Sequence, residues 1–177
     1  VLRLDNDSLE AQLELAGIYL RKHQIGDAFE FLSQVKDGIS TRDDVGQTFI
    51  IRYRYTLALG YIARGDRERG HKVLSDLIAV DKTFTPAYTA LATSYLKMGK
   101  VQVAEFITRR GLDRGKESPA LHNLMGVISE SSRRTVAARN WYDKALTMAP
   151  TFAPALVNRA NLSIRSLEYG AAEGDLI

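Results

Sequence analysis

Apolar and small residues recur along the chain with the spacing of amphipathic α-helices. Leu91, Ala92 and Tyr95 fall at i, i+1 and i+4, which places them on one face of a helix. Stretches of this kind alternate with short turns, such as Gly65-Asp66 and Gly99-Lys100. The pattern therefore predicts an all-α chain built from helical hairpins.

The same pattern predicts where each helix lies. We expect helices at residues 8–22, 25–36, 45–64, 67–80, 85–98, 101–114, 119–131, 135–148 and 153–167, and the start of another at 169. Ser118-Pro119 and Thr85-Pro86 mark two starts, because a hydroxyl side chain caps a helix and proline suits its first position. Asp43 or Asp44 is expected to cap a longer helix after a loop near 37–43.

Small residues reveal an internal repeat. Gly70, Ala104, Ala138 and Ala172 follow one another at a constant spacing, whereas Ala28 precedes Gly70 by a longer one. From the difference we infer that eight residues are inserted before the second repeat. A single helical hairpin cannot bury its own apolar face, so the hairpins are expected to stack on one another.

The repeat resembles the tetratricopeptide repeat (TPR) family, whose unit is a helix–turn–helix of about 34 residues. The spacing of the small residues matches that unit. The Leu-Ala-x-x-Tyr core begins at Leu15, Leu57 and Leu91, whereas Met125 and Arg159 begin copies that depart from it. No copy has the family's tryptophan, and only one keeps the terminal proline. The resemblance implies a right-handed α-solenoid of stacked antiparallel helix pairs, the TPR superhelix.

The repeat register predicts one TPR array over residues 1–177. Its parts are the tail of a preceding repeat at 1–7, then repeats at 8–42, 43–84, 85–118 and 119–152, and a partial repeat at 153–177. The chain begins with Val1 rather than Met, and its first residues read like the end of a second helix. We expect that it belongs to a longer array.

Composition narrows the chemistry that the chain can perform. Cysteine is absent, which excludes disulfides, thiolate nucleophiles and cysteine-ligated metals. The three histidines, His23, His71 and His122, occupy unrelated places in the repeats, and no catalytic or phosphate-loop motif occurs. We expect no enzyme activity, no cofactor and no bound metal. No apolar run is long enough to span a bilayer, and both cytoplasmic and periplasmic locations stay open.

TPR arrays serve as protein-interaction scaffolds whose first helices line a concave groove. Transferring the family's groove positions to this chain gives Leu13, Leu20, Tyr55, Leu59, Ile62, Thr89, Thr93, Leu96, Asn123, Val127, Val157, Asn158 and Asn161. These residues are neutral or apolar, which favours an apolar or amphipathic protein segment over a charged terminus. The alternative is a regulatory or substrate-recruiting arm of a larger enzyme or of a bacterial assembly, secretion or export machine.

Charge is distributed unevenly, and basic residues gather in the second half. The formal net charge is +3, and residues 89–177 contain 12 basic and 8 acidic side chains. Arg109, Arg110 and Arg114 lie near one expected helix end, where cations also stabilise the helix dipole. The sequence leaves a solvated face and an anionic partner both open. Aromatic residues are not interleaved with these arginines, which disfavours nucleic acid. Self-association through incomplete repeat ends is also expected.

Overall fold

The computed structural model describes residues 8–42, 44–114 and 118–174. These residues form helices joined by short turns, and no strand occurs among them. The helices are α1 (Leu9–Arg21), α2 (Ile25–Ser40), α3 (Gln47–Ala63), α4 (Arg67–Val80), α5 (Thr85–Lys97), α6 (Val101–Arg114), α7 (Pro119–Ser131), α8 (Thr135–Met148) and α9 (Ala153–Gly174). The all-α prediction is confirmed.

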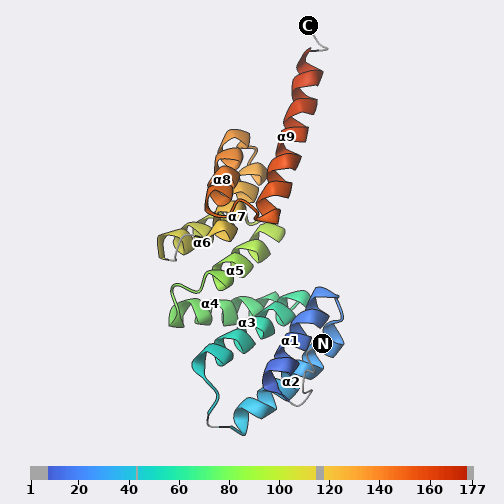
Figure 1. Ribbon diagram of the computed structural model, residues 1–177, viewed down its shortest axis with the longest axis vertical. Coiled ribbons are helices and arrows are strands. Elements are labelled where there is room, and N and C mark those ends of the chain that lie inside the picture. Colours follow the sequence, from blue (N-terminus) through green and yellow to red (C-terminus); the bar gives the residue numbers. More distant parts are fainter. Residues whose placement is uncertain (1–7, 43, 115–117, 175–177) are drawn as a thin grey trace. The chain divides into compact units, whose positions relative to one another are not determined.

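Contacts divide the chain into two compact units, Val1–Asp81 and Lys82–Ile177. The first unit contains the hairpins α1–α2 and α3–α4, and the second contains α5–α6, α7–α8 and then α9 (Figure 1). Within each unit the first helices of successive hairpins are neighbours, since α1 contacts α3 and α5 contacts α7. This order of stacking is that of an α-solenoid.

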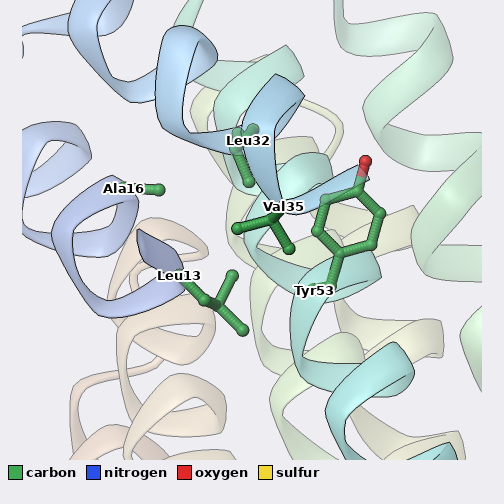
Figure 2. Packing of buried hydrophobic residues seen from close by; sticks show 5 residues of the cluster. All are labelled: Leu13, Ala16, Leu32, Val35 and Tyr53. Atoms are coloured by element: carbon green, nitrogen blue, oxygen red, sulfur yellow. The ribbon is translucent and has the colours of Figure 1, made fainter. Parts of the chain in front are cut away.

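Small residues allow the two helices of each hairpin to approach closely. Six alanines at the expected positions have no exposed surface, namely Ala16, Ala28, Ala58, Ala92, Ala104 and Ala138. Larger side chains fill the space between successive hairpins. Figure 2 shows Leu13 of α1, Leu32 and Val35 of α2 and Tyr53 of α3 around one such core.

Left-handed residues close the hairpins at one repeated position. His23, Gly65, Gly99 and Arg133 have φ values of 58°, 94°, 72° and 57°. Their spacing along the chain equals that of the small residues Ala28, Gly70, Ala104 and Ala138, so each occupies the same place in its repeat. A residue with positive φ cannot continue a right-handed helix, and the chain therefore reverses there.

The final helix differs from the prediction. We expected a turn near residue 168, but α9 continues without a break from Ala153 to Gly174 (Figure 1). Leu167 follows Arg133 by one full repeat, so it stands where the other repeats have their left-handed residue. A leucine in that conformation costs roughly 1–2 kcal/mol. The turn signal is thus missing, and Ala160 of α9 is exposed rather than covered by a second helix.

The eight inserted residues mainly lengthen two helices. α3 has 17 residues against 13 in α5, and α2 has 16 against 14 in α4. The expected loop near 37–43 therefore starts later, because α2 runs through Ser40. Gly46 precedes α3 in place of an aspartate cap, and Asp43 lies outside the described residues.

The two predicted hydroxyl caps had different outcomes. Ser118 accepts a hydrogen bond from the backbone N–H of Leu121, which confirms it as the cap of α7. The prediction for Thr85 was wrong, because α5 begins at Thr85 itself and the residue before it is Phe84. The division into repeats stays a prediction, although every observed hairpin falls inside one expected repeat.

Candidate functional site

A cleft of about 370 Å³ lies between α1 and α3 in the N-terminal unit, and we call it the α1/α3 groove. Its lining residues are Leu13, Glu14, Gly17, Leu20 and Arg21 of α1, and Arg52, Tyr55, Thr56, Leu59 and Ala63 of α3. On each helix most of these residues recur at intervals of three or four, so they share one face. The groove thus joins the first helices of two successive hairpins.

Gly17 keeps the middle of the α1/α3 groove open. A Cβ atom added to Gly17 would meet only a guanidinium nitrogen of Arg21, at 3.6 Å. The surrounding surface comes from Leu20, Tyr55 and Leu59, whose side chains are half-buried. Burial raises the pKa of the Tyr55 hydroxyl, so this side chain is neutral at physiological pH.

Charged residues at one end of the groove are already paired. Arg52 of α3 donates hydrogen bonds to Glu10 Oε2 at 2.7 Å and to Glu14 Oε1 at 2.5 Å, both on α1. Exposed pairs of this kind contribute little to the free energy of folding. They do hold the two walls in register.

The structure brings four of the predicted groove residues together in this cleft, namely Leu13, Leu20, Tyr55 and Leu59. Leu13 is only 3% exposed and belongs mainly to the core. Ile62 does not line the groove. A Cβ atom on Gly70 would lie 2.6 Å from Ile62 Cγ1, so the Ile62 side chain packs against α4.

Predicted residues of the C-terminal unit are largely occupied by internal contacts. Leu96 and Val127 pack against buried clusters. Asn158 Nδ2 of α9 donates to Asn123 Oδ1 of α7 at 2.9 Å, which joins these two helices. The hydroxyl of Thr89 donates to the carbonyl of Thr85 at 3.1 Å.

Three further predicted residues have exposed or half-buried side chains: Thr93 on α5, and Val157 and Asn161 on α9. Val157 is 57% exposed. None of the three lines either of two clefts in this unit, one bordered by α7, α8 and α9 and the other by α6, α7 and α8. Their part in binding stays a prediction.

A polar cluster that the sequence did not predict joins three helices. Tyr142 of α8 donates a short hydrogen bond to Glu130 of α7, and Arg165 of α9 donates to Glu130 Oε1 at 2.5 Å. Burial, together with the hydrogen bond to Glu130, raises the pKa of the Tyr142 hydroxyl. These partners lie on different helices, and no local sequence pattern indicates such contacts.

The basic cluster is partly neutralised, and it lies beside an aromatic ring. Glu105 accepts hydrogen bonds from Arg134 and Arg109, both at 2.8 Å, and these bonds lower the pKa of its carboxyl group. The guanidinium of Arg110 lies 6.0 Å from the centre of the Phe106 ring. One ring beside the cluster does not interleave aromatic residues with the arginines, and the expectation that nucleic acid is disfavoured stays a prediction.

Neither a metal-binding cluster nor a membrane-spanning helix is found in the described residues. In residues 8–42, 44–114 and 118–174, no group of three or more acidic or histidine side chains could hold a metal ion. Across these residues, no helix combines the length and the apolar character needed to cross a membrane.

Solved structures resemble the chain over most of its length. A tetratricopeptide repeat protein from Parabacteroides merdae has a TM-score of 0.74 at 16% identity, over 90% of this chain and 59% of that protein. TTC0263, a thermophilic TPR protein of Thermus thermophilus, has a TM-score of 0.71 at 20% identity, over 90% of this chain and 84% of its own.

Cut9, in the hetero-tetramer of Cut9 and Hcn1 of the APC/C, has a TM-score of 0.68 at 18% identity. The match covers 96% of this chain and 32% of Cut9. The chain thus spans only part of the Parabacteroides protein and of Cut9. No protein-family model and no curated protein matches the sequence. From the repeated hairpins, the buried small residues and these structural likenesses, we conclude that the chain has the tetratricopeptide-repeat fold.

Proposed function

We propose that the chain is a non-catalytic protein-interaction scaffold that binds an apolar or amphipathic segment of a partner protein in the α1/α3 groove. The observation that carries this proposal is the half-buried apolar surface of Leu20, Tyr55 and Leu59 around the open position of Gly17. A concave apolar surface is typical of a partner-binding site. The TPR fold supports the same function, because such arrays present their first helices to partners.

The paired charges at the Arg52 end of the groove favour an uncharged contact there. Arg52 is already bound by Glu10 and Glu14, so it has no unsatisfied charge to offer a carboxylate. A volume of about 370 Å³ suits one or two apolar side chains of an amphipathic helix or an extended peptide. Affinity is therefore expected to depend weakly on salt, since screening acts mainly on exposed charges.

Partner capture with groove variants tests this proposal. Tyr55→Ala and Leu59→Asp are expected to weaken capture strongly, because one removes apolar surface and the other places a charge in it. A photo-crosslinking amino acid at position 59 should form a covalent adduct with the same partner. The control places the same photo-crosslinking amino acid at position 136 of α8. Val136 is 76% exposed and lies in the other unit.

Charge reversal of Arg109 and Arg110 provides the second control. The groove proposal expects the same partner to be captured by Arg109→Glu/Arg110→Glu as by the unchanged chain. If these reversals abolish capture while Tyr55→Ala and Leu59→Asp have no effect, the basic surface binds this partner and the groove proposal is wrong.

A second candidate function is a recruiting or regulatory arm within a larger assembly. It is favoured by the likeness to Cut9, which occurs in a complex with Hcn1 and of which this chain covers 32%. Copurification of the native protein with a catalytic or assembly component would support this function. Recovery of the native protein without such a component would count against it.

Self-association also stays a prediction, and exposed side chains of α9 support it. Leu156, Val157 and Ile164 are 39%, 57% and 54% exposed. Static light scattering over a range of concentrations is expected to show a dimer that Ile164→Glu dissociates. A monomer at every concentration would contradict this prediction.

A further inference from the structure

A second cleft, of about 380 Å³, lies across α6, α7 and α8 in the C-terminal unit, and we call it the Trp141 cleft. Its lining residues are Arg109, Leu112 and Asp113 of α6, His122 of α7, and Trp141 and Lys144 of α8. It combines apolar walls with cationic side chains from two different helices. The α1/α3 groove belongs to the other unit, and the two clefts share no lining residue.

The Trp141 ring forms a fixed wall of this cleft. The Nζ atom of Lys144 lies 4.4 Å from the ring centre, and the His122 ring lies 5.7 Å away at an angle of 47°. Trp141 also packs against the buried cluster that contains Leu124 and Met125. The ring is therefore held in place by its own chain, with an ammonium group beside it.

Cations exceed carboxylates around the Trp141 cleft. Arg109 and Lys144 line it against the single carboxylate of Asp113. Glu105, the other acidic residue of α6, is shared between the guanidinium groups of Arg109 and Arg134. Lys144 forms no ion pair with any residue that the structure describes. The surplus charge gives the surface a positive potential that attracts acidic groups.

We propose that the Trp141 cleft binds an acidic segment of a partner protein. Its carboxylates pair with Arg109 and Lys144 at the rim, and an apolar side chain packs against Leu112 and the edge of Trp141. Arginine presents several donors to a carboxylate, and Lys144 adds a point charge from a second helix. The cleft is large enough for one apolar side chain with its charged neighbours.

The state of Trp141 favours a peptide over single-stranded nucleic acid. Binding of single strands depends on aromatic faces on which successive bases stack. Lys144 lies over the Trp141 ring and His122 packs beside it, so the ring is already engaged. An acidic peptide needs only the cations and part of the apolar wall, and Arg109 and Lys144 are exposed while Trp141 is half-buried.

The tryptophan itself reports on binding, because Trp141 is the only tryptophan in the chain. A glutamate-rich peptide that contains phenylalanine is titrated into the complete chain while Trp141 emission is followed. We expect a saturable change in emission at low ionic strength that weakens as salt rises. The same peptide with glutamine in place of every glutamate is expected to leave the emission unchanged.

Paired charge removals locate the site. Arg109→Gln/Lys144→Gln should weaken binding of the acidic peptide at least tenfold, because the double change removes both cations of the cleft. It leaves the Glu105–Arg134 pair intact. The matched control is Arg67→Gln/Lys97→Gln, which removes two exposed cations on α4 and α5 and should bind like the unchanged chain. Circular dichroism melts confirm that both pairs stay folded.

The outcomes distinguish an acidic peptide from nucleic acid or lipid as the ligand, and the Trp141 cleft from the α1/α3 groove as the site. Leu59→Asp should not affect the acidic peptide, whatever it does to partner capture at the α1/α3 groove. The proposal is overturned if the peptide leaves Trp141 emission unchanged, or if both charge-removal pairs bind it equally. It is also overturned if a single-stranded oligonucleotide or vesicles of anionic lipid use Arg109 and Lys144 while the peptide does not.

Discussion

The effect of a single residue on stability depends on how closely its neighbours pack, and Gly111 is an example. Gly111 takes a position that Val35, Leu77 and Ala145 occupy in the other repeats. The sequence leaves two interpretations, a weak point in α6 or a close helix contact. A Cβ atom on Gly111 would lie 3.0 Å from Tyr88 Cβ and from Leu121 Cδ1, so the close contact is correct.

We predict that Gly111→Ala lowers the free energy of unfolding by about 1 kcal/mol, because overpacking of about 1–3 kcal/mol exceeds the gain in helix propensity. Tyr88 Cβ is next to the backbone and cannot swing away. Urea denaturation measures the change. A higher unfolding free energy in the variant would show that α5 and α7 yield easily, contrary to this prediction.

The ionisation of Glu105 is coupled to the stability of the fold. Hydrogen bonds from Arg134, and then from Arg109, hold the pKa of this carboxyl group below its ordinary value of 4.5. A lowered folded pKa stabilises the protein above the ordinary value, and this stabilisation is lost as the pH falls through the folded pKa.

The free energy of unfolding is therefore expected to fall as the pH drops below about 5, with a contribution from this network of the order of 1 kcal/mol. Glu105→Gln should show a shallower decrease in melts measured at a series of pH values. Glu68→Gln, on an exposed glutamate of α4 outside the network, is the matched control. Identical pH profiles for the two variants would contradict the role assigned to Glu105.

Helical hairpins are the elements of this fold, and a left-handed residue closes each one. His23 and Arg133 adopt this conformation although they are not glycines, and contact between the paired helices stabilises it. At Leu167, α9 continues instead. The turn thus depends on one backbone conformation, and glycine adopts that conformation most readily.

Two glycines separate the effect of backbone conformation from that of space, because neither has an atom within 4 Å of an added Cβ. Gly99 has a φ of 72°, so Gly99→Ala is expected to lower the free energy of unfolding by roughly 1 kcal/mol. The melting temperature should fall with it. Gly26 lies in α2 without a positive φ, and Gly26→Ala should raise stability by about 0.5–1 kcal/mol. Changes of the same sign would refute this explanation.

At the scale of the whole molecule, each unit has its own buried core. Leu32 is 1% exposed in the cluster formed by α1, α2 and α3, and Met125 is fully buried in the cluster formed by α5, α6 and α7. Repeat arrays are stabilised by contacts between neighbours, so local damage is expected to stay mostly local.

We predict that Leu32→Ala, at a cost of about 2–5 kcal/mol, accelerates amide hydrogen exchange in α1–α4 far more than in α5–α9. Met125→Ala should show the reverse pattern. Equal acceleration throughout the chain in either variant would mean that the two units unfold together.

The sequence by itself determined the hairpins, the positions of most helices and the identity of the tightly packed small residues. These features follow from periodicity, and from glycine and proline signals that act over a few residues. Ala16, Ala58 and Ala92 could be assigned to helix contacts because their place in the repeat requires a small side chain. The turn expected near residue 168 was wrong, because α9 continues through Leu167.

Only the tertiary structure decided which groove positions are open. Ile62 packs against Gly70, whereas Leu20, at the same position of its repeat, lines the α1/α3 groove. Val127 packs against a buried cluster, whereas Leu59, its equivalent, also lines the groove. The Trp141 cleft was likewise visible only in the tertiary structure, because Trp141 and Lys144 line it together with residues of α6 and α7. Exposure and pairing depend on side chains from helices distant in sequence, and local periodicity carries no information about those neighbours.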